Sequence, residues 1–418
     1  MNVQIKKAAH RSGTVTAPPS KSVSHRAILA AALAPTETEL KNVALSQDIT
    51  ATLGALPLLG KTFSYDESTK TLHIKQGETV GNVLDCGESG STMRFLMPIF
   101  AALGKEVTYT GRGRLPERTY EDLKRVLCAH GAVYSAPSGL PVTISGKLAC
   151  GDYELKGSVS SQYITGLLFA LPLLNGNSRI RLTDALQSEG YVKMTEIVLR
   201  DFGVKSQLSS EICGNQTFRG GSYRVEGDFS NAAFFLVYGA LNGGMTVKGL
   251  NLASAQGDRA ICELLKKMGA RIEMHADAIT VYPSRLKGIR ADVGQIPDLA
   301  PILSVAMACA EGESELCNAQ RLRAKESDRL QGIYENLRAV GIRCEFTENG
   351  VKIFGGVPSG KEWNGYSDHR MVMSGAVMAS QIASGLLVTD AEAVKKSYPD
   401  FFESLLQVGG TEHVVDVG

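Results

Sequence analysis

The 418-residue sequence has no surplus of either charge, because 44 Lys and Arg residues balance 43 Asp and Glu residues to a net charge of +1. A dedicated nucleic-acid binder carries a basic footprint, so this balance argues against a nucleic-acid partner and leaves small anionic ligands open. There is also no run of 18 apolar residues and no apolar stretch of signal-peptide length near the start. We therefore expect a cytoplasmic protein that has no membrane anchor.

The eight cysteines include no C-x-x-C pair and do not cluster with the seven histidines. This arrangement favours neither a zinc site nor a disulfide framework. Cys262 and Cys309 fall in apolar helical patterns, so we expect buried, free thiols and a reducing compartment. The sequence also lacks a G-x-G-x-x-G after a strand and a phosphate-binding G-x-x-x-x-G-K-[ST] loop. We therefore expect no metal and no cofactor.

Glycine, in contrast, is abundant at 44 residues, and six glycines mark an internal repeat. Each ends an amphipathic helical pattern and precedes a short strand-like run, as expected for a left-handed residue that closes a helix. The six are Gly60, Gly131, Gly203, Gly269, Gly341 and Gly409, at separations of 71, 72, 66, 72 and 68 residues. Repeats of this length exceed those of most solenoids, and the chain length favours two or three domains.

A second series of six helical patterns alternates with the first and is apolar on nearly all sides, which predicts helices buried inside a domain. The patterns start near residues 24, 91, 161, 230, 298 and 369. Strand-like runs lie between the helices: EVTYTG, PVTISG, RIRLTD, SYRVEG, MTVKGL, AITVYP, VKIFGG and LLVTD. We expect six modules of strands and two helices each, and chain crossings between two halves at TAPPSKS and VEGDFSN.

The buried helices start with polar clusters that suit anion recognition at helix N-termini. The clusters are Ser20–Arg26, Ser89–Arg94, Ser160–Gln162 and Ser367–Arg370. Ordinary N-capping would also explain Ser and Asp at these positions. Three clusters contain an arginine that we place in the first helical turn, where a cation opposes the helix dipole unless an anion is present, so we favour anion binding.

Further cations and a few acids stand in polar surroundings. Lys325 and Arg329 lie in LRAKESDRL with Glu326, and Asp298 lies in QIPDLAP. A solvated helix face and a plain N-cap are the ordinary alternatives for these two segments. Many cations beside two or three acids suit proton transfer on a multiply anionic substrate.

The ordered motifs resemble the 5-enolpyruvylshikimate-3-phosphate synthases of the enolpyruvyl transferase superfamily along the whole chain. They are PPSKSVSHR, CGESGSTMR, GRGRLPERTYEDL, GSVSSQYITGLL, VEGDFSNAAFFL, IPDLAPIL, LRAKESDRL, SDHRMVM and KKSYPDFF. The resemblance implies an α/β, two-domain enolpyruvyl transferase fold with six βαβαββ repeats, three per domain, buried helices and an active site in the interdomain cleft. It implies one domain of residues 1–19 plus 227–418, on the phosphoenolpyruvate side, and one of residues 20–226, on the shikimate 3-phosphate side.

The implied reaction transfers the carboxyvinyl group of phosphoenolpyruvate to the 5-hydroxyl of shikimate 3-phosphate, releases phosphate and serves aromatic amino acid biosynthesis. Asp298, Glu326 and Lys21 would be catalytic. Shikimate 3-phosphate would contact Lys21, Ser22, Arg26, Ser160, Ser161, Gln162, Ser188, Tyr191, Asp298 and Lys325. Phosphoenolpyruvate would contact Lys21, Gly90, Arg118, Gln162, Arg329, Arg370 and Lys396. We expect a monomer whose partners are these two substrates, with no nucleic acid and no membrane.

Three positions depart from the family's common pattern: Glu88, Phe95 and Arg321. Gly90 leaves room for the herbicide glyphosate, so we expect inhibition. A sister enzyme that acts on UDP-N-acetylglucosamine carries a cysteine in the loop equivalent to GRGRLPERT, and this loop has none. A non-enzymatic anion-binding module would keep the serines and arginines but would have no need of Asp298 and Glu326.

Overall fold

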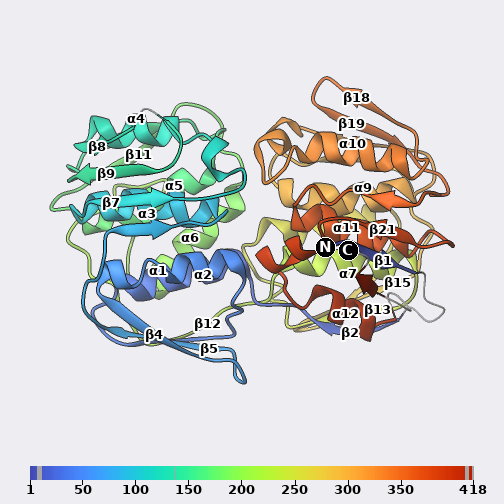
Figure 1. Cartoon of the computed structure of the whole chain (residues 1–418), viewed down its shortest axis with the longest axis horizontal. Coiled ribbons are helices and arrows are strands. Elements are labelled where there is room, and N and C mark those ends of the chain that lie inside the picture. Colours follow the sequence, from blue (N-terminus) through green and yellow to red (C-terminus); the bar gives the residue numbers. More distant parts are fainter. Residues whose placement is uncertain (7–11, 137, 410–413, 417–418) are drawn as a thin grey trace. The chain divides into compact units, whose positions relative to one another are not determined.

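A computed structural model describes residues 1–6, 12–136, 138–409 and 414–416. The chain forms two compact units, Met1–Pro18 with Gly227–Gly418, and Pro19–Glu226. We call them the discontinuous unit and the continuous unit. In Figure 1 the continuous unit runs from blue to green, and most of the discontinuous unit from yellow to red. The first crossing falls between Pro18 and Pro19, which places Pro19 in the continuous unit, not in the other one as expected.

In the continuous unit, three buried helices alternate with three outer helices. The buried helices are α1 (Lys21–Leu33), α3 (Gly90–Ala102) and α5 (Ser161–Ala170), and the outer ones are α2 (Gln47–Leu53), α4 (Glu121–Ala129) and α6 (Glu189–Asp201). The strands are β3 (Thr38–Lys41), β4 (Lys61–Asp66), β5 (Thr71–Gln76), β6 (Val83–Asp85), β7 (Val107–Thr110), β8 (Ala132–Tyr134), β9 (Val142–Gly146), β10 (Asp152–Leu155), β11 (Arg179–Leu182) and β12 (Ser222–Arg224).

The discontinuous unit repeats this alternation. Its buried helices are α7 (Phe229–Leu241), α9 (Ala300–Ala308) and α11 (His369–Ala379), and its outer ones are α8 (Ile261–Lys267), α10 (Arg329–Ala339) and α12 (Phe401–Gln407). Its strands are β1 (Val3–Ile5), β2 (Gly13–Thr16), β13 (Met245–Lys248), β14 (Arg271–Met274), β15 (Ala278–Tyr282), β16 (Arg290–Asp292), β17 (Glu313–Cys317), β18 (Cys344–Thr347), β19 (Gly350–Phe354), β20 (Glu362–Trp363), β21 (Leu386–Val388) and β22 (Val414–Asp416).

Within the described residues each unit contains three sheets. Five of the six sheets have four strands, in the orders β12-β3-β5-β4, β6-β7-β9-β8, β14-β15-β13-β2, β16-β17-β19-β18 and β20-β21-β1-β22. The sixth, β10-β11, has two strands, so the third repeat lacks the second pair of strands that a βαβαββ unit predicts.

The two strands next to the crossings are exchanged between repeats. β2 precedes α1 of the continuous unit but pairs parallel with β13 of the discontinuous unit. β12 precedes α7 of the discontinuous unit but pairs parallel with β3 of the continuous unit. Each unit therefore completes one of its sheets with a strand whose own helix belongs to the other unit.

The local expectations from the sequence are confirmed with one exception. The six buried helices and five of the outer helices form where the patterns place them, and all eight strand-like runs form strands. The pattern before Gly60 is wrong in its helix, because α2 ends at Leu53 and a separate helical turn, Pro57–Leu59, precedes Gly60. All six glycines have φ between 67° and 107°, the left-handed region that glycine enters without a steric penalty, so each lies where the chain turns into its next strand.

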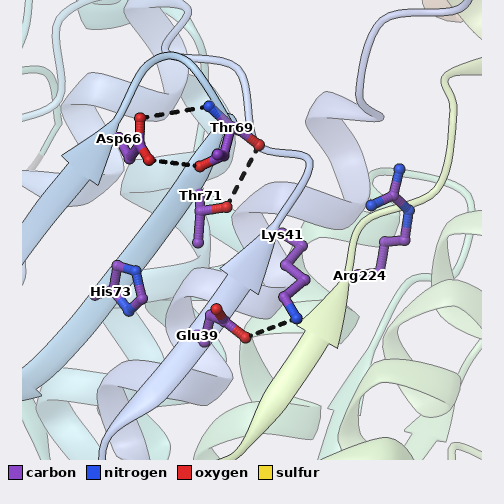
Figure 2. A pocket seen from close by; sticks show the side chains of 7 residues that line it. All are labelled: Glu39, Lys41, Asp66, Thr69, Thr71, His73 and Arg224. Carbon is purple, nitrogen blue, oxygen red and sulfur yellow. Dashed lines mark hydrogen bonds and ion pairs between the residues drawn. The ribbon is translucent and has the colours of Figure 1, made fainter.

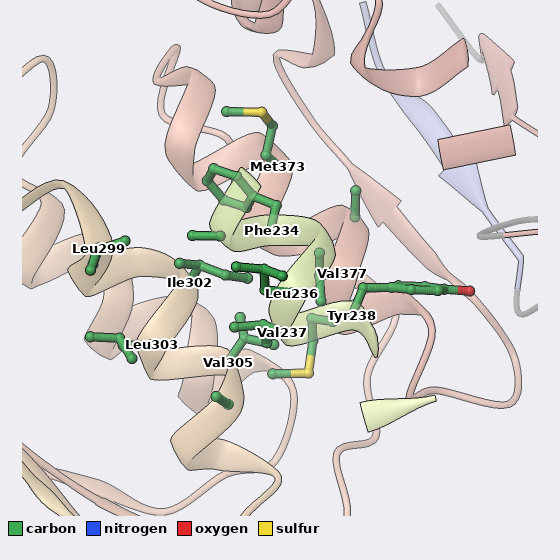
Figure 3. Close-up of a cluster of buried hydrophobic side chains, with 14 of the residues drawn as sticks. Phe234, Leu236, Val237, Tyr238, Leu299, Ile302, Leu303, Val305, Met373 and Val377 are labelled. Atoms are coloured by element: carbon green, nitrogen blue, oxygen red, sulfur yellow. The ribbon is translucent and has the colours of Figure 1, made fainter. Parts of the chain in front are cut away.

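The core of the discontinuous unit lies where its three buried helices meet, because α7, α9 and α11 contact one another. Figure 3 shows Phe234 and Val237 of α7, Ile302 and Val305 of α9, and Val377 of α11 in this cluster, and all five side chains are buried. These helices are buried on every side. The ionisable residues of α11, His369 and Arg370, lie at its start, whereas the polar side chains in the middle of α9 and α11 are the small hydroxyls of Ser304 and Ser374.

The cysteine expectation is wrong for three residues. Cys128, Cys150 and Cys213 are exposed, whereas Cys86, Cys262, Cys317 and Cys344 are buried and Cys309 is half-buried. All eight are free thiols. Burial raises the pKa of the Cys309 thiol to about 12 and that of Cys262 to about 11. These two thiols stay protonated at neutral pH and pack as small apolar side chains.

The contact between α3 and α5 depends on a glycine. Gly166 of α5 lies against α3, where a Cβ atom would be 2.6 Å from the Arg94 carbonyl oxygen and 2.8 Å from Cγ of Pro98. Pro98 lies inside α3 and has no N–H to donate to the Arg94 carbonyl four residues back. The two backbones can approach only because position 166 carries no side chain.

We expect Gly166→Ala to destabilise the protein by about 1–3 kcal/mol, since the methyl group overpacks a backbone contact that cannot move. The measurement is the urea midpoint of unfolding. Gly244→Ala is the control, because a Cβ there has its nearest neighbour 3.8 Å away, in Tyr282. Equal midpoints for the two variants would contradict the close approach of α3 and α5.

Candidate active site

In the discontinuous unit, a buried guanidinium joins three carboxylates. Arg329 is the first residue of α10, and its side chain is 1% exposed. It donates hydrogen bonds to Asp298 over 2.7 Å, to Glu326 over 2.8 Å and to Asp368 over 2.8 Å. A buried ion is tolerated when its charge and its donors are satisfied in this way, and the planar fork of arginine suits several carboxylates at once.

Asp298 in turn lies among three cations. One carboxylate oxygen is 2.7 Å from Arg329 and 3.6 Å from Nζ of Lys325, and the other is 3.3 Å from Arg370. Asp298 belongs to the short helical turn Pro297–Leu299 before α9 and does not cap that helix, so the plain N-cap alternative is wrong. The solvated-face alternative for the KESDR segment is also wrong, because Lys325 and Arg329 face this cluster.

The environment shifts the pKa values of the two basic residues in opposite directions. Burial lowers the pKa of Lys325, although Asp298 and Glu326 act against this shift. Burial also acts to lower the pKa of Arg329, but Asp368, Glu326 and Asp298 together hold it well above its ordinary value. Arg329 is therefore permanently charged, whereas Lys325 is the more easily deprotonated cation of the cluster.

Arg370 and Lys396 complete the predicted set at the start of α11. Lys396 ends the helical turn Ala391–Lys396 and donates a hydrogen bond over 2.9 Å to the carbonyl of Ser367. Asp368 caps α11, so Arg370 lies in its first turn. The other two arginines do not fit this expectation, because Arg26 and Arg94 lie in the second turns of α1 and α3.

In the continuous unit, Arg26 joins the starts of α1, α5 and α6. Its guanidinium donates to the hydroxyls of Thr195 over 2.8 Å and Thr165 over 3.2 Å, and to the carbonyls of Ser22 over 2.7 Å and Tyr191 over 3.1 Å. Burial lowers the pKa of Arg26 to about 10, which leaves it charged at neutral pH. The structure thus brings Ser22, Arg26 and Tyr191 together.

Ser188 lies next to this group, at the residue before α6. It is 1% exposed and has a φ of 58°, a left-handed conformation that costs energy for a residue with a side chain.

A second group joins the starts of α3 and α5. Ser160 caps α5 through the N–H of Gln162. The Gln162 amide oxygen accepts from Arg94 over 2.7 Å, and its nitrogen donates to Ser91 over 2.9 Å. Ser161 is buried at the first position of α5. Three hydroxyls, an amide and a guanidinium are therefore held at two helix N-termini, an arrangement that suits an anion.

Lys21 and Gly90 stand at the first positions of α1 and α3. Lys21 pairs with Asp48 over 2.7 Å, and both side chains are largely covered. Gly90 lies against Arg118, where a Cβ atom would be 2.9 Å from Nη1. Arg118 follows the helical turn Leu115–Glu117 and so reaches the start of α3 from another loop.

Four residues outside the predicted set of site residues contact or face one of its members: Asp48, Arg94, Asp258 and Asp368. Only Arg94 and Asp368 carried a signal, as parts of polar helix starts. Asp258 is buried in the turn Gly257–Ala260, where it accepts a hydrogen bond from Ser230 of α7. Burial and the nearby charge of Asp298 raise the pKa of Asp258 to about 7, although Arg370 acts against them.

The hollow in Figure 2 contains none of these residues. It has a volume of about 460 Å³ and lies on the polar face of the β12-β3-β5-β4 sheet, where the strand register sets Arg224 beside Lys41 and Glu39 beside His73. Asp66, Thr69 and Thr71 complete its lining. Lys41 pairs with Glu39 over 3.0 Å, so charges on this face already compensate one another.

In the part of the chain that the structure describes, no helix is long and apolar enough to cross a bilayer. No group of three or more His, Cys, Asp or Glu residues there could hold a metal ion.

Comparison with known proteins gives the class first. A solved EPSP synthase from Acinetobacter baumannii superimposes with a TM-score of 0.83 at 28% identity, covering 99% of both chains. The enolpyruvyl transferase NikO from Streptomyces tendae gives a TM-score of 0.82 at 18% identity, covering 100% of this chain and 99% of that one, and supports the fold alone. The fold is that of an enolpyruvyl transferase.

Sequence comparison then gives the family. The model of the family described as EPSP synthase (3-phosphoshikimate 1-carboxyvinyltransferase) matches residues 5–405. A 3-phosphoshikimate 1-carboxyvinyltransferase from Clostridium kluyveri is 43% identical over 408 residues, 95% of each chain, and one from Clostridium acetobutylicum is 41% identical over 417 residues, 97% of each chain. The chain belongs to the EPSP synthase family.

The raised pKa of Asp258 predicts a specific pH dependence of stability. Between its ordinary value of 3.8 and about 7, the folded protein keeps a proton that the unfolded chain releases, so this stabilising contribution is lost as the pH rises through that window. Asp258→Asn keeps a neutral partner for Ser230 and avoids the loss. We therefore compare the thermal midpoint of Asp258→Asn with that of the unsubstituted protein at each pH. The midpoint of the variant minus that of the unsubstituted protein should be larger at pH 8 than at pH 5.

Asp66 supplies the control for this experiment. Hydrogen bonds from Ser68 and Thr69 lower its pKa, so it is ionised in both states at pH 5 and pH 8. Asp66→Asn should leave the difference between the two pH values unchanged. If Asp258→Asn behaves in the same way, Asp258 does not carry the proton.

Proposed function

We propose that this chain transfers the carboxyvinyl group of phosphoenolpyruvate to the 5-hydroxyl of shikimate 3-phosphate and releases phosphate, by addition and elimination through a tetrahedral intermediate. One observation carries the proposal beyond family membership: Asp298 lies among Arg329, Lys325 and Arg370, and the same Arg329 also holds Glu326. Cations for an anionic substrate and carboxylates for proton transfer are thus held in one cluster.

The continuous unit supplies the proposed shikimate 3-phosphate side. Ser22, Arg26, Ser188 and Tyr191 lie around the starts of α1 and α6, and Ser160, Ser161 and Gln162 form the start of α5. We assign the phosphate to the hydroxyls and N–H groups at the start of α5, with Lys325 as a further cation. Helix N-termini and hydroxyls suit a phosphate because their N–H and O–H groups donate to its oxygens.

The proposed phosphoenolpyruvate contacts are mainly cationic. They are Lys21, Gly90, Arg118, Gln162, Arg329, Arg370 and Lys396. Arginines bind carboxylate and phosphate oxygens in pairs, which suits a substrate that carries both groups. Each cation in this set that is paired with an acid of the protein can exchange that acid for a substrate oxygen, so the protein's carboxylates hold the site in place before substrate arrives.

In the proposed chemistry, protonation of the methylene carbon of phosphoenolpyruvate accompanies attack of the 5-oxygen on its C2 atom. Asp298 accepts the 5-hydroxyl proton, and Glu326 serves the methylene carbon, with Lys21 as a further candidate for that transfer. The intermediate then loses a methyl proton and phosphate, which restores the double bond. The surrounding cations stabilise the charge of the intermediate.

The test is phosphate release from the protein mixed with both substrates. Asp298→Ala and Asp298→Asn should each lower kcat roughly 10²- to 10⁴-fold, since a positioned acid or base contributes about that factor. Lys21→Met should also abolish most of the release. Lys41→Met is the matched control, because Lys41 is an exposed lysine paired with Glu39 outside the proposed site.

The outcomes are distinct. No release by the unsubstituted protein would refute the reaction. Release that survives Asp298→Asn at full rate would refute only the role of Asp298.

Gly90 leads to a prediction about glyphosate. We expect glyphosate to inhibit in competition with phosphoenolpyruvate. Gly90→Ala should displace Arg118 and raise the KM for phosphoenolpyruvate by roughly tenfold or more, because a hydrogen bond to a charged group is worth about 1.5–3 kcal/mol. The KM for shikimate 3-phosphate is the internal control. A glyphosate titration without competition would contradict the expectation.

We further propose that the protein acts as a monomer in the cytoplasm. Size-exclusion chromatography with light scattering tests the first point, and fractionation of the source cells tests the second.

A further inference from the structure

A buried histidine stands between the proposed substrate contacts of α1. His25 follows Lys21 by one helical turn, precedes Arg26 and is 1% exposed. Its Nδ1 atom lies 2.7 Å from the hydroxyl of Thr52 in α2. Its Nε2 atom is buried and has no hydrogen-bond partner among the described residues. Only one edge of the imidazole is therefore used.

The Thr52 hydroxyl also belongs to a chain of hydrogen bonds that ends at Ser89, the residue that caps α3. Thr52 lies 2.7 Å from the hydroxyl of Thr92, which donates to the Ser89 hydroxyl over 2.8 Å. Ser89 also accepts the N–H of Thr92 over 3.2 Å and so caps α3 immediately before Gly90. The chain links the proposed substrate contacts of α1 to the first turn of α3.

The direction of this chain assigns the proton on the imidazole. A hydroxyl has one hydrogen to donate, and both threonines have a second acceptor in the Asp48 carbonyl, at 3.4 Å. We assign the hydrogens to the shorter contacts, so that Thr92 donates to Ser89 over 2.8 Å and Thr52 donates to Thr92 over 2.7 Å. In this assignment Thr52 accepts from His25, the imidazole carries its proton at Nδ1, and Nε2 carries the lone pair.

The surroundings of His25 keep it neutral. Burial, followed by the charges of Lys21 and Arg26, lowers the pKa of His25 well below its ordinary value. The groups packed around the ring add no acid: the edge of Phe95 from α3 meets it at a centroid distance of 6.3 Å, and the Arg26 guanidinium lies 5.1 Å from the same Phe95 ring. Asp48 offers its carbonyl to the threonines and its carboxylate to Lys21.

We propose that His25 is a positioning residue for phosphoenolpyruvate binding: its Nδ1–H group, through Thr52 and Thr92, fixes the first turn of α3 at Gly90 relative to Lys21. The proposal rests on the proposed function, because it takes Gly90 and Lys21 as phosphoenolpyruvate contacts. Shikimate 3-phosphate shares Lys21, but its other contacts on α1, α5 and α6 are not joined by the hydroxyl chain, whereas Gly90 is a contact of phosphoenolpyruvate alone. The effect should therefore divide between the two substrates.

The kinetic test uses His25→Leu, which fills the site but has no donor, and His25→Asn, whose amide places an N–H near the position of Nδ1. His25→Leu should raise the KM for phosphoenolpyruvate roughly two- to tenfold, the worth of one hydrogen bond, with the KM for shikimate 3-phosphate changed by less than about twofold. His25→Asn should restore the original KM. Ser24→Ala is the matched control, because the Ser24 hydroxyl is buried in the same helix and has no hydrogen-bond partner among the described residues.

Thr52 gives a second approach should His25→Leu fail to fold. Thr52→Val breaks the same chain and should raise the same KM, and Thr52→Ser should restore it. In a double-mutant cycle, the KM for phosphoenolpyruvate of the variant with both His25→Leu and Thr52→Val should not exceed that of the single variant with the higher KM. Either change alone already interrupts the same chain. The proposal would be overturned if the KM values for the two substrates rose equally or if the effects of the two single substitutions were additive. It would also be overturned if the KM for phosphoenolpyruvate were unchanged in both series of variants.

A measurement independent of activity separates this proposal from the reaction itself. In the ¹⁵N spectrum of the histidine-labelled protein at pH 7, His25 should be the Nδ1–H tautomer, and Thr52→Val should change its Nδ1 signal. An Nε2–H tautomer would overturn the proposal even in an active enzyme. Absence of phosphate release by the unsubstituted protein would instead refute the proposed function and leave the tautomer result standing.

Discussion

A helix buried on every side has room for charged groups only near its ends, and the chemistry of this protein follows from that constraint. The backbone N–H groups of the first turn have no partner inside the helix, so each buried helix needs acceptors at its start. Ser20, Ser89, Ser160, Asp228 and Asp368 meet that need by capping α1, α3, α5, α7 and α11. Capping and substrate recognition are therefore not alternatives here. The capping residue satisfies the N–H groups at the start of the helix, and the residues next to the cap are left to bind an anion.

The same constraint produces an equivalent arrangement in each unit. In the discontinuous unit, Asp298 before α9 and Asp368 before α11 share Arg329, and Ser230 of α7 holds Asp258. In the continuous unit, Arg26 and Arg94 donate instead to neutral acceptors, which are hydroxyls, backbone carbonyls and the Gln162 amide. The difference suits the division of labour that we propose, with carboxylates for proton transfer in one unit and hydroxyls for a phosphate in the other.

Electrostatic balance explains how so many charges are buried. Arg329 is almost completely covered, a position that would be very costly for an unpaired ion, but three carboxylates surround it. Asp258 avoids the cost of a buried charge by staying neutral. Because it is buried near Asp298, it keeps its proton at a pH where an exposed carboxyl is ionised. The near-neutral net charge of the sequence conceals these local concentrations of both signs.

The sequence by itself determined the elements and the family: the six glycines, the apolar helices and the strand-like runs are local patterns, and a period in sequence fixes which face of an element is buried. Only the tertiary structure decided that β2 and β12 are exchanged, that Asp258 lies near Asp298, that Arg329 holds Asp368 from 39 residues away, and that Thr52 joins His25 to Thr92. It also decided that three cysteines are exposed. The reason is physical: hydrophobic periodicity specifies burial along one element, whereas a hydrogen bond or ion pair between distant residues depends on how whole elements pack, and nothing in the local pattern records that geometry.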